Sequence, residues 1–331
     1  MIRHRCSLGV FLSVVLSLVA ASSVLAAGGP TGGAKKSGIS DQGSGIENTA
    51  QVRKDGDAAK AGEKDAGATS ASASAPSASA AQADDDDGTL NLAQPDFTVI
   101  TMPTTLRLPR FKGTFRVTHR FGRPLGAGDF GDLVGDLFGL DSGALIGLEY
   151  RFGLMRGAQV GIYRTSNKTI QFFTEYNLVK RGAERPVGLS IHASIEGTNN
   201  FKDSYSPALG LILSREIGDR AALYAQSIWV NNSNPLPRLL TDADNDTFMI
   251  GLGARVQFGS GVYLVGEWVP RIAGFHPGVD HGSFAIEKRA GGHVFQLNFS
   301  NDTGTTVAQV ARGGGSNDDW YLGFAISRKF F

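Results

Sequence analysis

The chain has 331 residues, 44 of them glycine, with a formal net charge of +1 and a hydrophobic content of 41%. Its charged residues are scattered singly along the sequence, which argues against a nucleic-acid partner because such a partner demands a concentrated basic surface. Beyond residue 26, no apolar run is long enough for a membrane-spanning helix. Any membrane crossing in that part of the chain would have to be made by strands.

The first residues have the layout of a secretory signal peptide. Positions 3–5 are basic, residues 8–21 form a short apolar run, and small residues follow up to Ala26. This layout predicts a signal peptide over residues 1–26, since the apolar run is short for a membrane anchor. Cys6 is the only cysteine and lies before the run, so we expect a mature protein without disulfides or a reactive thiol.

Residues 27–90 are almost entirely small or polar. Alanine, serine and glycine dominate them, and an acidic run, Asp84–Asp87, lies near their end. Such a segment cannot bury enough apolar surface to offset its chain entropy, so its composition predicts a disordered linker. Residues 91–112 are a transitional segment. Their apolar residues would suit a short extra strand, but three prolines disfavour a central strand there.

Residues 113–331 show repeated alternation of apolar side chains with polar or small ones. Between residues 247 and 258, for example, apolar side chains occupy every even position from 248 onward. A period of two predicts strands with one apolar face. We predict about twelve such strands, at residues 114–122, 143–152, 157–164, 168–179, 187–197, 205–216, 220–231, 247–258, 261–269, 283–289, 292–301 and 319–331.

Short and long connections alternate between these strands. Tight turns follow the second, fourth, sixth, eighth and tenth strands, whereas longer loops follow all the odd ones except the third. Bacterial outer-membrane barrels are built in this way. The last strand would close the barrel against the first and leave no free sheet edge. The sequence therefore predicts an all-β fold, a transmembrane antiparallel β-barrel of about twelve strands in the bacterial outer membrane, with its disordered N-terminal linker in the periplasm.

Several segments are similar to those of a known family. The chain resembles the membrane-bound β-barrel family named domain of unknown function 5777 from about Gly113 to Phe331, most specifically in Gly292–Asn301. The resemblance implies a bacterial membrane barrel, and it carries no known activity or catalytic residue. The other similar segments are His119–Gly122, Phe138–Asp141, Ile146–Tyr150, Val160–Ser166, Lys168–Thr169, Pro186–Leu189 and Ile326–Arg328.

If the apolar phase faces lipid, the opposite phase carries charged side chains into the interior of the barrel. They would either line a narrow aqueous pore and set its selectivity, or pair across the lumen and close it. Trp229, Trp268 and Trp320 fall near the same end of their strands, so we expect them to be aromatic residues of a membrane interface. The predicted lumen-lining residues are Glu149, Arg151, Glu175, Glu196, Arg255 and Glu267.

Two classes of function fit these features. The first is a narrow pore or transport barrel, or a purely structural barrel. The alternative is a barrel-wall hydrolase acting on lipid, because His192, Ser194 and Glu196 share one strand face and could supply a base, a nucleophile and a carboxylate. Same-face neighbours along a strand stand roughly 6.5–7 Å apart at the backbone, which favours ordinary polar residues over a catalytic group. We therefore predict no catalytic residues and no enzymatic activity.

The sequence contains no motif for a cofactor or a metal ion, so we expect neither. The partners that a barrel of this kind implies are outer-membrane lipid, the barrel-assembly machinery, and small solutes or ions. No nucleic-acid partner is expected.

Overall fold

The computed structural model describes residues 91–331, apart from 182–186, 235–243 and residue 315. The predicted signal peptide (1–26) and linker (27–90) lie outside the described residues.

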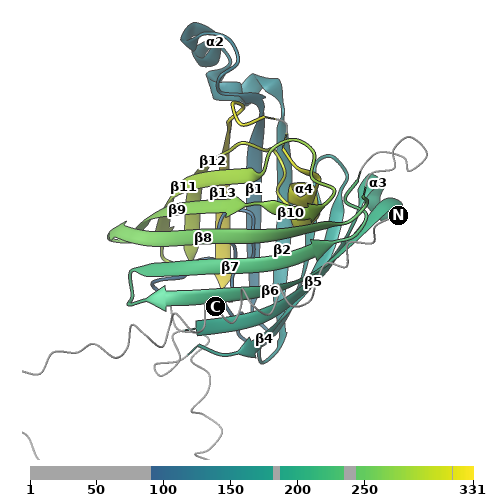
Figure 1. The fold of residues 1–331 in the computed structure, drawn as a ribbon. Coiled ribbons are helices and arrows are strands. Elements are labelled where there is room, and N and C mark those ends of the chain that lie inside the picture. The colour runs from purple at the N-terminus through teal and green to yellow at the C-terminus, as the bar shows by residue number, and fades with distance from the viewer. Residues whose placement is uncertain (1–90, 182–186, 235–243, 315) are drawn as a thin grey trace, which may run out of the picture. The chain divides into compact units, whose positions relative to one another are not determined.

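The described residues form a closed antiparallel barrel (Figure 1). Strands that follow each other in the chain are neighbours in the ring, and the first and last strands pair to close it. The predicted closure of the barrel is thus confirmed. The strands are β1 (Gly113–Pro124), β2 (Ala144–Met155), β3 (Ala158–Thr165), β4 (Ile170–Val179), β5 (Val187–Gly197), β6 (Asp203–Ile217), β7 (Ala221–Val230), β8 (Thr247–Gly259), β9 (Val262–Val269), β10 (Arg271–Gly274), β11 (His281–Ala290), β12 (His293–Ser300) and β13 (Tyr321–Phe330).

One place in the ring is shared by two strands. Both β9 and β10 pair with β8, and Pro270 separates them because proline has no backbone N–H to donate to the ladder. With β9 and β10 counted together, the barrel has 12 strands, as predicted. The strand β10 was not predicted, because the sequence placed its residues in the loop after Val269.

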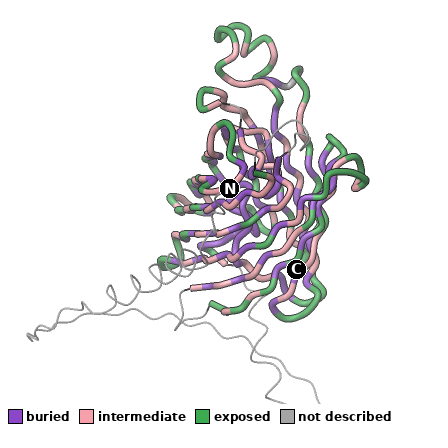
Figure 2. The backbone as a smooth tube through the Cα atoms, turned by 45° about the vertical axis from the view of Figure 1, so that its right-hand side comes forward, coloured by how far each residue is buried: buried purple, intermediate pink, exposed green. Residues whose placement is uncertain are grey.

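The alternation of side chains along each strand separates an outer apolar face from a polar interior. Buried and exposed residues alternate along the strands in Figure 2. On β8, Leu252 and Val256 point outward and are 41% and 47% exposed, whereas Arg255 points inward and is 0% exposed. Large apolar residues that are exposed on strand after strand suit a lipid environment, because lipid removes the penalty that water would impose.

Most of the short connections lie at one end of the barrel and most of the long ones at the other; the β3–β4 connection, residues 166–169, is a short one at the long-loop end. The short-turn end carries the connections after β2, β4, β6, β8 and β11, together with the C-terminus of β13. The long-loop end carries the helices, and α2 projects beyond the strands there in Figure 1. Among the described residues, no helix has the length and apolar character needed to span a membrane. The helices are α2 (Phe130–Gly135), η3 (Leu137–Ser142), α3 (Thr198–Phe201) and α4 (Val307–Arg312).

Acidic side chains are unevenly distributed between the two ends, whereas both ends carry exposed cations, which at the long-loop end are Arg164, Lys168 and Lys202. Among the described short turns, Asp219 is the one exposed acidic residue. The long-loop end instead carries Asp129, Asp132, Asp136, Asp203, Asp244, Asp280, Asp318 and Asp319. We call the exposed cations around the short-turn end, together with the half-buried but outward-facing Arg215, the basic ring; they are Arg110, Lys112, Arg156, Lys180, Arg181, Arg215, Arg220, Lys288 and Arg328.

Candidate functional site: a lumen filled from both ends

Residues 91–108 lie inside the barrel, and we call them the lumen hairpin. They turn back on themselves through an antiparallel bridge between Thr98 and Pro103. The backbone N–H of Val99 donates to Met102 O at 2.8 Å, and both side chains are 0% exposed. The segment pairs only with itself and lies across the lumen, so it adds no strand to the wall.

The tip of the hairpin is held by one carboxylate on the wall. Glu267 on β9 accepts hydrogen bonds from the backbone N–H groups of Ile100 (3.1 Å), Thr101 (3.2 Å) and Met102 (3.0 Å). His281 Nε2 lies 3.4 Å from the other oxygen of Glu267. Hydrogen bonds to an ionised acceptor are about twice as strong as neutral ones, so Glu267 is the main anchor of the tip.

Side chains from other strands donate to the carbonyl groups of the same tip. Most buried backbone groups hydrogen-bond to other backbone groups, but those of the hairpin tip hydrogen-bond to side chains of the wall. Arg116 on β1 donates to Ile100 O (2.8 Å), Gln226 on β7 to Pro103 O (3.0 Å), Arg255 on β8 to Thr98 O (2.9 Å) and Gln296 on β12 to Val99 O (2.9 Å).

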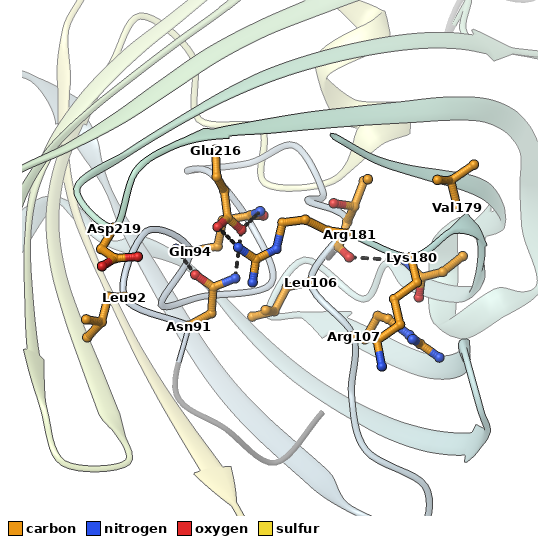
Figure 3. Close-up of a pocket in the computed structure, with 13 residues that line it drawn as sticks. Asn91, Leu92, Gln94, Leu106, Arg107, Val179, Lys180, Arg181, Glu216 and Asp219 are labelled. Atoms are coloured by element: carbon orange, nitrogen blue, oxygen red, sulfur yellow. Dashed lines mark hydrogen bonds and ion pairs between the residues drawn. The ribbon is translucent and has the colours of Figure 1, made fainter. Parts of the chain in front are cut away.

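The base of the hairpin is anchored at the short-turn end (Figure 3). Glu216 on β6 accepts from the side-chain amides of Asn91 (2.8 Å) and Gln94 (2.6 Å), and it also pairs with Arg181. A cavity of about 240 Å³ lies beside these residues, between the hairpin and the wall. It is lined mainly by polar and charged side chains, including Arg107 and Asp219.

A second segment fills the lumen from the long-loop end. α4 is short, but its Val307, Ala308, Val310 and Ala311 are all buried. They form one apolar cluster with Met102 of the hairpin and with wall residues of β6 to β9. The two inserted segments therefore share a core near the long-loop ends of β7, β8 and β9.

α4 is fixed to the wall by Glu196 on β5. Arg312 Nη1 lies 2.8 Å from Glu196 Oε1, and the hydroxyl of Thr306, the residue that caps α4, donates to Glu196 Oε2. The Glu196 side chain is fully buried, whereas the Arg312 side chain is 21% exposed, so only the carboxylate of this pair is shielded from solvent. Removing one partner of a buried pair leaves the other charge uncompensated.

Glu196→Gln is expected to loosen α4 without unfolding the barrel. The substitution keeps the shape of the side chain but removes the charge that faces Arg312. Hydrogen exchange at residues 305–312 should rise by about tenfold or more, in line with the 1.5–3 kcal/mol of a charged hydrogen bond. Glu175→Gln, at a carboxylate that bonds to Arg151 instead, is the matched control and should leave this segment protected. Equal protection in both variants would contradict the assignment.

The six predicted lumen-lining residues are all buried in the interior. Arg151 lies 3.1 Å from Glu149 and 3.4 Å from Glu175, which makes a compact triad next to Phe97 of the hairpin. The other three do not join this triad, since Glu196 pairs with Arg312, Arg255 with Glu287, and Glu267 with the hairpin tip. Each of the six charged side chains is thus paired or hydrogen-bonded with another group of the described structure.

Sequence reasoning missed several residues that complete this interior. Arg116 and Arg120 on β1 and Glu287 on β11 are buried in the lumen and belong to the same polar phase as the predicted residues. The alternation of their strands contained that information. No local signal pointed to the hairpin or α4 as their partners.

The proposed hydrolytic residues are not assembled into a catalytic group. His192 is buried, and no described residue hydrogen-bonds either of its ring nitrogens. It borders a lumen cavity of about 30 Å³, between the hairpin, the wall and the segment before α4. Glu196 is engaged by Arg312 and Thr306, and not by His192 or Ser194.

The three tryptophans lie at the long-loop ends of their strands. Trp229 and Trp268 are 41% and 53% exposed on the outer surface. Trp320 directly precedes β13, and its ring packs against Phe284 at 5.5 Å between centroids.

A family model described as membrane bound beta barrel domain (DUF5777) matches residues 96–330. The chain belongs to this family. The DUF5777 match begins within the lumen hairpin, so it includes the hairpin tip as well as the wall. In the described residues of this DUF5777 protein, no group of three or more histidine, cysteine or acidic side chains is arranged to hold a metal ion.

Three solved structures are similar to this DUF5777 protein at low sequence identity. The NanC porin has a TM-score of 0.43 and 8% identity over 66% of this chain and 99% of that one. The outer membrane channel DcaP of Acinetobacter baumannii has a TM-score of 0.32 and 10% identity, over 67% of this chain and 96% of that one. Outer membrane phospholipase A from Escherichia coli has a TM-score of 0.35 and 11% identity, over 72% of this chain and 95% of that one. A search of curated protein sequences found no match.

Proposed function

We propose that this outer-membrane barrel is a plugged channel for small hydrophilic solutes or ions, which the lumen hairpin closes and opens. The observation that carries the proposal is the way the hairpin is held. Its tip is bonded to the wall through side chains such as Glu267 and Arg255, with no strand pairing to the barrel. Such a segment can leave while the strand ladders of the wall stay intact.

The polar character of the interior supports a displaceable plug over a permanent core. Arg255 and Glu287 form an ion pair with both side chains 0% exposed. Burying such a pair gives less stability than well-packed apolar residues would, because desolvation offsets the attraction. Once the hairpin has moved, water can enter the lumen and hydrate these charged side chains of the wall. A ring of 12 strands is also wider than the eight-stranded barrels that side chains alone fill.

Both signs of charge face the lumen, so we assign the channel no strong ion preference. The lumen carboxylates Glu149, Glu175, Glu196, Glu267 and Glu287 face the four arginines Arg116, Arg120, Arg151 and Arg255 on the same wall, and Arg312 of α4 adds a fifth cation. The proposed permeants are therefore small polar molecules and ions of either sign.

The proposed orientation places the short-turn end in the periplasm, as in bacterial outer-membrane barrels. Residues 27–90 would then reside in the periplasm and lead directly into the base of the hairpin at Asn91. Outer-membrane lipid around the wall and the barrel-assembly machinery are the further partners that we propose. Trp229, Trp268 and Trp320 would mark the opposite membrane interface.

We propose no enzymatic role. Support comes from Glu196, whose carboxylate holds Arg312 and Thr306 and so is not available to orient His192. A hydrolase would need His192 and Ser194 in hydrogen-bond contact near a substrate, whereas no described residue hydrogen-bonds the His192 ring.

A reversible disulfide between hairpin and wall tests the proposal. A Cβ added at Gly188 on β5 would lie 3.2 Å from the Cβ of Thr105, close to the roughly 3.5–4.5 Å of natural disulfides. Cys6 is the one native cysteine and lies in the predicted signal peptide, so the engineered pair would have no competitor. The variant Thr105→Cys/Gly188→Cys should insert into planar bilayers as a non-conducting barrel when oxidised.

Reduction of the disulfide should restore the opening rate of the unmodified protein, and each single-cysteine variant should respond to neither oxidant nor reductant. Equal conductance in the oxidised and reduced states would show that the hairpin is not the gate. A folded barrel that never conducts, even when reduced and carrying a weakened hairpin anchor, would favour the closed structural barrel.

A further inference from the structure

Three cations of the basic ring stand on the outer faces of strands. Lys288 on β11 follows Ile286 on the same outward phase, and Arg328 on β13 follows Ile326. Arg215 on β6 likewise lies in the outward phase. These charges therefore face the membrane side of the wall and not the lumen.

Their depth is fixed by the residues around them. Ile286 and Ile326 are 51% and 37% exposed and belong to the apolar outer surface, and the cations come one outward position later, next to the short turns. Lys288 is also in register with Phe295, an outward residue that is 44% exposed. A charge at the boundary between the apolar surface and the turns lies where lipid headgroups lie, and its aliphatic stem can extend along the apolar surface.

The ring surrounds the barrel and does not form a single patch. Cations stand at the β2–β3, β4–β5, β6–β7 and β11–β12 connections and beside the β13–β1 seam. The β8–β9 turn has no cation of its own, but Lys288 Nζ donates to Ser260 O in that turn at 2.7 Å. A docked protein or polymer would contact one side of the barrel. A partner that meets cations on nearly every side is the lipid annulus itself.

We infer that the basic ring binds the phosphate headgroups of anionic phospholipids in the leaflet at the short-turn end. Basic residues immediately beyond a membrane-spanning segment attract anionic lipid electrostatically, and the attraction falls off within a Debye length. The long-loop end, with its acidic residues, would not attract such lipid. The inference goes beyond the proposed channel and does not rest on it, because it requires only that the barrel lies in a bilayer.

A second occupant with matching charge exists within the chain. The acidic run Asp84–Asp87 precedes Asn91, the first described residue at the short-turn end, by only a few residues. A short tether of this kind reaches only the part of the ring near the exit of the hairpin, beside Arg181 and Glu216. Lys288 and Arg328 belong to other strands and stand on the outer face, which favours lipid as the partner.

The test is lipid competition measured on the full-length protein by native mass spectrometry. The protein is ejected from mixed micelles that contain equal amounts of phosphatidylglycerol and phosphatidylcholine. We expect the unmodified protein to retain phosphatidylglycerol at least several-fold more than phosphatidylcholine. The triple variant Arg215→Gln/Lys288→Gln/Arg328→Gln should lose most of this preference.

The matched control removes the same charge from the other end. Arg164→Gln/Lys168→Gln/Lys202→Gln substitutes three exposed cations of the long-loop end and should keep the preference. In liposomes, exchange of a labelled anionic lipid at the unmodified protein should become non-selective at 1 M salt, where the Debye length is about 3 Å. This second measurement does not depend on the folding of any variant.

Three results would overturn the inference. The first is an unmodified protein that shows no preference for phosphatidylglycerol. The second is an equal loss of preference in the two triple variants. The third is a preference that appears only after Asp84–Asp87 are changed to asparagine, which would assign the ring to the acidic run in place of lipid.

Discussion

Glu267→Ala is expected to convert a mostly closed barrel into one that conducts. The substitution removes the acceptor of three consecutive backbone N–H groups at the hairpin tip. A buried donor without a partner costs about 1–3 kcal/mol, so even one such donor shifts the ratio of open to closed barrels by a factor of about 5 to 150. In planar bilayers the open probability should rise by at least that lower factor.

Two companion variants sharpen this measurement. Glu267→Gln keeps one side-chain oxygen as an acceptor and should give an intermediate open probability. Glu175→Gln changes a lumen carboxylate that bonds to Arg151 and not to the tip, and should behave as the unmodified protein does. Folding of each variant is checked by the heat-dependent gel mobility of the barrel. Folded Glu267→Ala barrels that stay as closed as the unmodified protein would contradict the role given to Glu267.

Leu252→Arg should block assembly of the barrel. Leu252 lies near the middle of β8, is 41% exposed on the outer face and is in register with Ala225 on β7. An arginine at a lipid-facing midplane position of a barrel costs about 2–4 kcal/mol. The yield of heat-modifiable barrel in the membrane fraction should therefore fall severalfold or more.

The control for this prediction stays on the same strand. Gln257 belongs to the lumen phase of β8 and lies near the short-turn end, so Gln257→Arg adds the same charge without exposing it to lipid. Its yield should remain close to that of the unmodified protein. If both variants assembled equally well, the assignment of the two faces of β8 would be wrong.

The wall of the barrel could be predicted from the sequence because its rules are local. Each strand has one apolar environment and one polar environment, so the alternation on β8 or β5 reports which face meets lipid without knowledge of any other strand. The alternation of short and long connections supplied the direction of each strand. Only the pair β9 and β10 departed from the prediction, because Pro270 interrupts one strand and its continuation was assigned to a loop.

The contents of the lumen could not be predicted in the same way. The hairpin tip binds Glu267, which lies more than 160 residues away in sequence, and contacts of that kind leave no periodic pattern. The prolines of residues 91–112 correctly argued against a central strand in the wall. A clue remained in the apolar residues Phe97, Val99 and Met102, which a solvated linker would not need and which are buried in the lumen.

The distribution of charge between the two ends was likewise hidden in the sequence. Lys288 and Arg328 are isolated cations when the chain is read in order, yet each stands next to a short turn and in the outward phase. Only the strand directions and the register of the pairs bring them to one depth. The sequence therefore indicated a neutral, evenly charged chain, where the barrel has an end with almost no exposed acidic residue and an end where acidic residues outnumber the exposed cations.

The apolar cluster that Met102 shares with α4 makes the two inserted segments dependent on each other. Burial of a methionine side chain is worth about 1.5–3 kcal/mol, so withdrawal of the hairpin weakens the attachment of α4 by up to that amount. Thermodynamic coupling is reciprocal, and displacement of α4 from the long-loop side must weaken the hairpin by the same factor. We therefore expect displacement of either segment to weaken the attachment of the other without any change in the strands between them.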